Sequence, residues 1–130
     1  TMQIHQSAED YLETILMLTQ RMGKVRSIDV VNELGFTKAS VSIAMKKLRE
    51  NGYIAVDGEG NLTLLEPGRE IAERIYSRHR LLTHFFIQLG VDEKTAAEDA
   101  CKAEHILSEQ TLEKIRESAL RTDAAAQEDE

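Results

Sequence analysis

The spacing of apolar residues predicts three helices in the first half of the chain. Apolar side chains recur every three or four residues from Ser7 to about residue 22, from Ser27 to Leu34 and from Thr37 to Glu50, which is the repeat of an amphipathic helix. Ser7–Asp10 resembles a capping box, and Thr37 is a favourable N-cap residue. A glycine follows each of the three segments, as expected where a helix ends.

The pattern then changes to one typical of a β-hairpin. Tyr53–Val56 and Leu62–Leu65 are short apolar segments, and the turn residues Asp, Gly and Asn fill the gap between them at Asp57–Asn61. Beyond the hairpin, helical spacing returns. It predicts three further helices, from Pro67 to about Gln88, from Asp92 to about Leu107 and from Ser108 to about Leu120.

This order of elements predicts a mainly α fold that begins with a winged helix-turn-helix. The short second helix, the tight turn after it and the polar face of the third helix match a helix-turn-helix, and the hairpin behind them is the wing. We expect a winged-helix DNA-binding domain over residues 1–66, a helical domain over residues 67–122 and a flexible acidic tail over residues 123–130.

The third predicted helix has a face suited to the major groove of DNA. Hydroxyl groups near its N-terminus can meet phosphates or base edges, methyl groups can contact thymine, and lysines can neutralise phosphate charge. An ordinary solvated face would mix both signs of charge, whereas residues 36–49 hold four bases and no acid. We therefore assign DNA binding to Thr37, Lys38, Ala39, Ser40, Ser42, Ile43, Lys46 and Lys47.

The net charge of −7 over 130 residues does not exclude nucleic acid, because the acids are concentrated elsewhere. Residues 92–130 hold twelve acids against five bases, which leaves a local basic face on an acidic body. Asp57 and Glu59 at the tip of the wing would repel phosphate, so the sequence leaves open whether the wing contacts DNA. A single cysteine, no signal-peptide pattern and no apolar run of transmembrane length indicate a cytoplasmic protein without a membrane partner.

Three residues with different ligand chemistry stand close together near the end of the fifth predicted helix. Cys101, Glu104 and His105 are spaced i, i+3 and i+4, which would place them on one helical face and suit a transition metal. The alternative is a buried cysteine beside a surface Glu-His pair. Asp10 and Glu13 share a face of the first helix, where Asp10 could also serve only the helix cap.

These segments together resemble the diphtheria-toxin-repressor-like metalloregulators, a family that includes iron-dependent repressors and manganese-transport regulators. The likeness runs in the family's order and spacing from Ser7 to Leu120. The matching stretches are Ser7–Glu13, Ser40–Ser42, Leu62–Leu64 with Gly68, Arg78–Leu82 and Cys101–His105. The chain is similar to the short form of the family, which lacks the SH3-like third domain.

The resemblance implies a metal-dependent repressor of metal-homeostasis genes, which binds palindromic operator DNA as a homodimer through a helical dimerisation and metal-binding domain. It implies Fe(II) or Mn(II) as cofactor, with up to two ions per subunit. The implied ligands are Asp10, Glu13, His79, Cys101, Glu104 and His105. The manganese branch usually has glutamate at the position of Cys101, and the iron branch usually has methionine at that of Asp10. The iron branch also usually has an acid where Thr83 stands and a histidine where Ala97 stands, so the resemblance does not carry over its ancillary site.

Two other functions compete with this interpretation. One is a winged-helix regulator that senses a non-metal ligand, in which the Cys-Glu-His group is structural. The other is an enzyme, either a metallohydrolase or a cysteine enzyme that uses Cys101 with His105. The sequence has no nucleophile elbow, oxyanion motif or Gly-rich phosphate loop, so we do not expect an enzyme.

Overall fold

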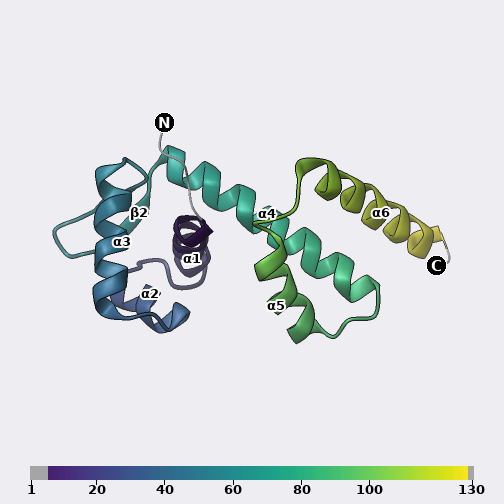
Figure 1. Cartoon of the computed structure of the whole chain (residues 1–130), viewed down its shortest axis with the longest axis horizontal. Helices are drawn as coiled ribbons and strands as arrows, with labels where there is room; N and C mark the ends of the chain where they lie inside the picture. Colours follow the sequence, from purple (N-terminus) through teal and green to yellow (C-terminus); the bar gives the residue numbers. More distant parts are fainter. Residues whose placement is uncertain (1–5, 129–130) are drawn as a thin grey trace. The chain divides into compact units, whose positions relative to one another are not determined.

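The computed structural model describes residues 6–128 and divides into two compact units, with the boundary between Arg74 and Ile75 (Figure 1). The first unit contains α1 (Gln6–Met22), α2 (Ser27–Leu34), α3 (Lys38–Glu50), β1 (Ile54–Val56), β2 (Leu62–Leu64) and the first turns of α4 (Glu66–Gln88). The second unit contains the remainder of α4, α5 (Glu93–Ala103) and α6 (Glu109–Glu128). The predicted fold, a winged helix-turn-helix followed by a helical part, is confirmed.

The first unit is held together by the apolar faces of α1, α3 and the hairpin. Leu12 and Ile15 on α1, Val41 on α3 and Ile54 on β1 are all at most 1% exposed. α1 contacts α2, α3 and β2, and α3 contacts α2 and β1. Because α3 uses this face for the core, its opposite face remains in solvent.

The turn between α2 and α3 has the local geometry that the sequence predicts. Gly35 ends α2 with a φ of 70°, a left-handed conformation that a residue with a Cβ rarely adopts. Thr37 caps α3, and its hydroxyl oxygen accepts a hydrogen bond from the main-chain nitrogen of Ser40 at 3.1 Å. Phe36 between them packs edge-on against Tyr11 of α1 with ring centroids 5.9 Å apart. The start of α3 is therefore fixed on both sides.

The wing is an antiparallel hairpin whose tip is held by hydrogen bonds among its own residues. Ile54 pairs with Leu64 and Val56 pairs with Leu62, and Leu62 also donates a main-chain hydrogen bond to Val25 at 2.7 Å. At the tip, hydrogen bonds from Asn61 and Glu59 hold the pKa of Asp57 below its ordinary value. The tip therefore carries a negative charge at neutral pH.

Gly68 lies in the first turn of α4, close to the backbone of Tyr53. A Cβ at this position would overlap the carbonyl oxygen of Tyr53 and lie 3.4 Å from Cδ2 of Leu12. That carbonyl oxygen also accepts a hydrogen bond from the main-chain nitrogen of Leu65 at 3.0 Å, so it cannot move away without weakening this bond. We expect Gly68→Ala to lower the free energy of unfolding by about 2 kcal/mol.

Urea denaturation of the metal-free protein measures this effect, and Gly58→Ala is the matched control. A Cβ on Gly58 would meet no atom within 4 Å, and its backbone lies outside the left-handed region. We expect the control to change stability by less than about 0.5 kcal/mol. Equal stability of the two variants would contradict the role assigned to Gly68.

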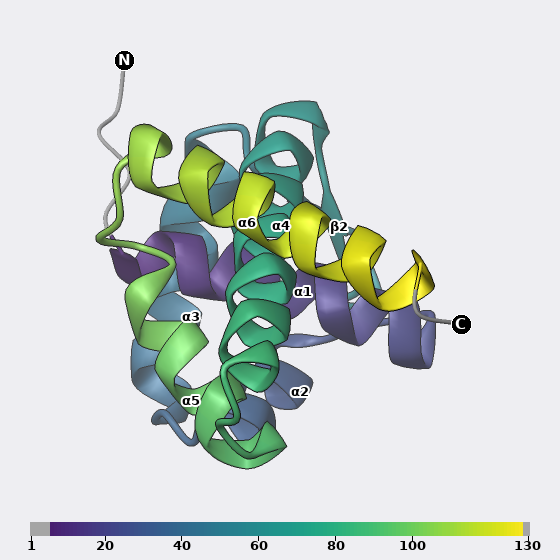
Figure 2. The same cartoon turned by 90° about the vertical axis from the view of Figure 1, so that its right-hand side faces the viewer.

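The core of the second unit joins all three of its helices. Leu82 on α4, Ala100 on α5 and Leu112 on α6 are at most 1% exposed and pack together, and Figure 2 shows α6 crossing α4. Leu81, Phe86 and Ile115 pack against this cluster. Across residues 6–128, no helix combines the length and the hydropathy that a bilayer span requires.

Three predicted helix ends differ from the structure. Ser7 lies inside α1, whose described part begins at Gln6, so Ser7 is not the N-cap. α5 ends at Ala103 instead of Leu107, and residues 104–107 form a turn that leads to Ser108, the N-cap of α6. α6 runs to Glu128 instead of Leu120, and the strong helix former alanine occupies residues 124–126.

Candidate metal centre and DNA-binding face

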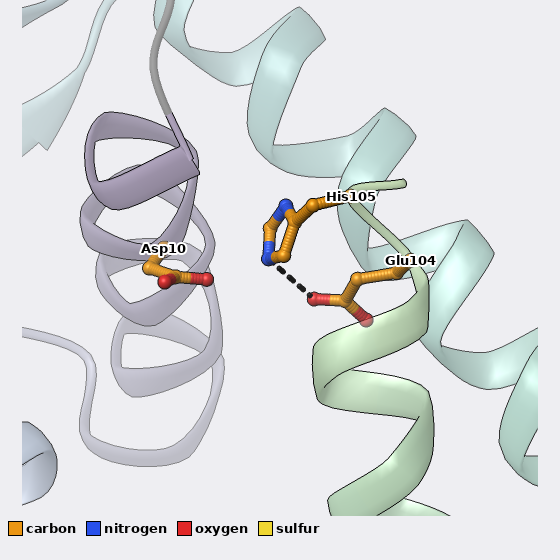
Figure 3. Close-up of side chains that lie close together, drawn as sticks. All are labelled: Asp10, Glu104 and His105. Atoms are coloured by element: carbon orange, nitrogen blue, oxygen red, sulfur yellow. Dashed lines mark ion pairs between the residues drawn. The ribbon is translucent and has the colours of Figure 1, made fainter. Parts of the chain in front are cut away.

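A buried carboxylate lies between two imidazoles in the second unit. Glu104 follows the last residue of α5, and its side chain is fully buried. Its Oε2 lies 3.0 Å from Nδ1 of His79 on α4. Its Oε1 lies 3.4 Å from Nε2 of His105, an ion pair that Figure 3 marks with a dashed line. The turn after α5 thus brings together three of the residues that the sequence analysis singled out.

This group has the chemistry of a divalent-metal site. A buried carboxylate is costly unless it is paired or coordinates a cation. Oε1 of Glu104 is buried and accepts no hydrogen bond within the described part of the chain, although His105 lies beside it. Carboxylate oxygen and imidazole nitrogen are ligands that Mn(II), Fe(II) and Zn(II) all accept. The donors present therefore fit a divalent transition metal.

The turn that carries Glu104 and His105 is anchored by an arginine. Nη1 of Arg78, on α4, donates to the main-chain oxygen of Glu104 at 3.3 Å. Nη2 of the same guanidinium pairs with the carboxylate of Glu109 in the first turn of α6. Sequence analysis placed Arg78 only in a motif beside His79 and did not assign it a role.

Cys101 corrects both interpretations of the Cys-Glu-His spacing. α5 ends before Glu104, so the three residues do not share one continuous helical face, and that prediction is wrong. The alternative of a buried cysteine beside a surface Glu-His pair is also wrong, because Cys101 is exposed whereas Glu104 is buried and the His105 side chain is 2% exposed. That Cys101 is a metal ligand stays a prediction.

Asp10 and Glu13 lie in the first half of α1, in the other unit. Glu13 is buried with 6% of its surface exposed, and Asp10 is half-buried; Figure 3 shows Asp10 on α1. Because Ser7 is inside the helix, Asp10 does not complete a capping box with it. Both acids therefore remain predicted ligands.

The outer face of α3 is exposed along its whole length. All eight residues assigned to DNA binding, from Thr37 to Lys47, are exposed, and Ile43 is 58% exposed. A hollow of about 410 Å³ runs beside the start of the helix, lined by Ser27, Ile28, Val31, Lys38 and Ser42. A second hollow of about 250 Å³ is lined by Ser27, Ser42, Met45, Lys46, Arg49 and Val56.

Sequence analysis missed two contributors to this face. Ile28 at the start of α2 is 43% exposed and lines the first hollow, and Arg49 lines the second beside Lys46. Arg49 belongs to the same acid-free stretch as Lys46, which was a usable signal. Ile28 has no comparable signal, because helical spacing alone assigns it to the core face of α2.

Two family models match the chain in succession. One is described as the N-terminal DNA binding domain of iron dependent repressors and matches residues 3–62. The other is described as the metal binding and dimerisation domain of iron dependent repressors and matches residues 65–122. The Glu104 cluster lies within the second match, and α3 lies within the first.

Individual proteins show the same relationship. An uncharacterized HTH-type transcriptional regulator of Methanocaldococcus jannaschii is 37% identical over 85% of this chain and 90% of its own length. The HTH-type transcriptional regulator MntR of Bacillus subtilis is 34% identical over 84% of this chain and 77% of that protein. A solved structure of a manganese-dependent transcriptional repressor in complex with manganese is 28% identical, with a TM-score of 0.79 over 86% of this chain and 52% of that one.

This chain spans about half the length of that structure and of several other solved structures that it resembles. Relatives that are more than 30% identical, together with two successive family models, confirm the resemblance seen in the sequence. The chain therefore belongs to the diphtheria-toxin-repressor-like family of metal-dependent transcriptional regulators, whose members are not enzymes.

Proposed function

We propose that this protein is a repressor of metal-homeostasis genes, which binds operator DNA as a dimer when it is loaded with Fe(II) or Mn(II). The observation that carries the proposal is the buried Glu104 carboxylate between His79 and His105, within the segment that matches a metal binding and dimerisation domain. The MntR relatives and the manganese complex with a similar fold support a divalent metal.

The proposed ligands come from both units. Glu104, His79 and His105 would hold the ion in the second unit, together with Cys101 at the end of α5. Asp10 and Glu13 on α1 complete the set, which has enough donors for up to two ions per subunit. A divalent ion supplies concentrated positive charge on which carboxylates, imidazoles and a thiolate can converge.

The residues on α1 give the proposed link between metal and DNA. α1 packs against α3, so holding Asp10 and Glu13 also holds the helix on which α3 rests. Two such α3 helices, one per protomer, would have to match two half-sites of a palindromic operator. The metal raises DNA affinity only if it binds more tightly to the arrangement that fits DNA than to the arrangements that do not. The gain in DNA affinity cannot exceed this difference in metal affinity.

The second unit also offers an apolar surface for dimerisation. Ile106 is 77% exposed and Leu120 is 63% exposed. Leu112 is not part of this surface, because it is buried with Leu82 and Ala100 in the core of its own unit. We expect a dimer at micromolar concentration with and without metal, because the side chains of Ile106 and Leu120 need burial in either state. Sedimentation equilibrium checks this, and a monomer under both conditions would contradict it.

Anaerobic titration with metal, followed by DNA binding, tests the proposed function. Duplexes would first be selected from a random library with the whole chain in Mn(II), and their affinity then measured against increasing Mn(II) and Fe(II). We expect affinity to rise with at least one of these metals and to fall again when a chelator is added. If specific duplexes were enriched equally well with the chelator present at every step, the alternative function would be favoured, namely a winged-helix regulator that senses a non-metal ligand.

Substitutions at Cys101 should change which metal is effective. Cys101→Glu supplies a hard oxygen donor in place of a soft thiolate, so it should keep manganese-dependent DNA binding and weaken the response to Fe(II) or Co(II) about tenfold. Cys101→Ala should weaken the response to every metal, because it removes a ligand without replacing it. DNA binding is measured against each metal, with thermal melts alongside.

The exposure of Cys101 makes this series interpretable. A glutamate at an exposed position buries no charge, so Cys101→Glu should fold as well as the wild type. Lys102→Glu is the matched control, because it adds a carboxylate at the next exposed position of α5. If Cys101→Ala left the response to all metals unchanged, Cys101 would not be a ligand.

A further inference from the structure

Arg78 joins the end of α5 to the start of α6 by one guanidinium group. Nη1 donates to the main-chain oxygen of Glu104 at 3.3 Å, and Nη2 pairs with the carboxylate of Glu109. The arginine side chain is only 16% exposed, whereas that of Glu109 is 78% exposed. The intervening residues, from 104 to 108, are therefore held between two contacts to a single side chain of α4.

The contact to Glu104 bears directly on the metal ligands. The oxygen that accepts the hydrogen bond belongs to the peptide group between Glu104 and His105, and a peptide group is planar. Fixing that plane restricts ψ of Glu104 and φ of His105, and so restricts the directions in which both side chains leave the backbone. α5 ends at Ala103, and main-chain hydrogen bonds from Ile106 and Leu107 to the oxygen of Ala103 close the turn, while the oxygen of Glu104 accepts its hydrogen bond from Arg78.

We propose that Arg78 is a positioning residue of the metal site, which orients Glu104 and His105 before an ion binds. This inference rests on the proposed function, since it takes these two residues as ligands. Groups that orient metal ligands without touching the metal commonly change affinity about 10- to 100-fold. Arginine suits the task, because its rigid fork can donate to two acceptors at once whereas lysine is a single flexible point charge.

The other arginine pairs of the described chain do not share this arrangement. Arg116 pairs with Glu113 on the same helix, and both side chains are about half exposed. Exposed pairs of this kind contribute little to stability. Arg116→Ala is therefore a matched control that removes an arginine and an ion pair from the same unit while leaving the Glu104 turn untouched.

Metal affinity of the isolated protein tests the inference. Mn(II) and Co(II) dissociation constants would be measured by calorimetry for the wild type, Arg78→Ala, Arg78→Lys, Glu109→Ala and Arg116→Ala, with metal-free melting temperatures and Co(II) absorption spectra. We expect Arg78→Ala to bind about tenfold more weakly and with an altered Co(II) spectrum, Arg78→Lys and Glu109→Ala to bind with intermediate affinity, and Arg116→Ala to match the wild type.

A purely structural arginine would give a different result. It would lower the melting temperature of Arg78→Ala and leave both the Co(II) spectrum and the metal affinity of the folded protein unchanged, which would overturn the inference. If Arg78→Ala failed to fold, wild-type affinity in both Arg78→Lys and Glu109→Ala would overturn it equally. A wild type that bound neither Mn(II) nor Co(II) would overturn the proposed function and this inference with it.

Discussion

Glu104→Gln should leave the protein folded and remove its response to metal. Glutamine has nearly the size and shape of glutamate, so it can occupy the same buried space between His79 and His105. It lacks the negative charge that attracts a cation, and its amide nitrogen is not a metal ligand. We expect metal affinity to fall at least about a hundredfold and DNA affinity to stay at its metal-free level.

The experiment combines calorimetric metal titration with DNA binding at saturating Mn(II). Glu98→Gln is the matched control, because it makes the same chemical change at an exposed position of α5. A metal-free melt shows whether Glu104→Gln is folded. A folded Glu104→Gln protein with wild-type metal affinity would remove Glu104 from the site and with it the observation on which the proposed function depends.

Replacing Lys46 and Lys47 by alanine should weaken binding to every DNA sequence. Both lysines are exposed on the outer face of α3, and a dimer would present each of them twice. A phosphate contact contributes about eightfold to affinity at about 0.1 M salt, so four such contacts are worth about four-thousandfold. The double variant should also show a flatter dependence of affinity on salt concentration, because fewer counterions are released.

Metal affinity separates this effect from general damage. It should stay at the wild-type value in Lys46→Ala/Lys47→Ala, because these lysines belong to α3 and none of the proposed ligands does. Lys94→Ala/Lys114→Ala removes the same charge from exposed positions of the second unit and should bind DNA nearly as the wild type does. Normal operator binding by the first pair at moderate salt would show that α3 is not the DNA-reading helix.

The winged helix was predictable because its boundaries are set by local chemistry. Thr37 caps α3 through its own hydroxyl, and Gly35 ends α2 in a conformation that favours glycine. The β-hairpin likewise follows from the turn residues between two short apolar segments. Each of these signals acts over a few residues, and the packing of α1 against α3 reinforces them.

For the candidate metal centre, the sequence indicated residue types but not the geometry that brings Glu104, His79 and His105 together. Helical periodicity continues past Ala103 in the sequence, but the chain leaves α5 there and turns toward the Ser108 cap of α6. The burial of Glu104 depends on tertiary contacts, and its partner His79 lies 25 positions earlier in the chain. The contact from Arg78 to the Glu104 carbonyl spans 26 positions and uses a main-chain atom, which residue types along the chain do not reveal.

The composition of α3 has a consequence for the DNA itself. Adenine is usually recognised by asparagine or glutamine, and α3 from Lys38 to Glu50 contains neither. Besides the hydroxyls of Ser40 and Ser42, which can bond to any base, its exposed face offers an A·T pair the methyl group of Ala39 and the side chain of Ile43. If α3 reads the major groove, contact with the C5 methyl of thymine contributes to discrimination at such a pair. Replacing thymine by uracil, which pairs identically and lacks only that methyl group, would then weaken recognition of the operator without changing any base pair.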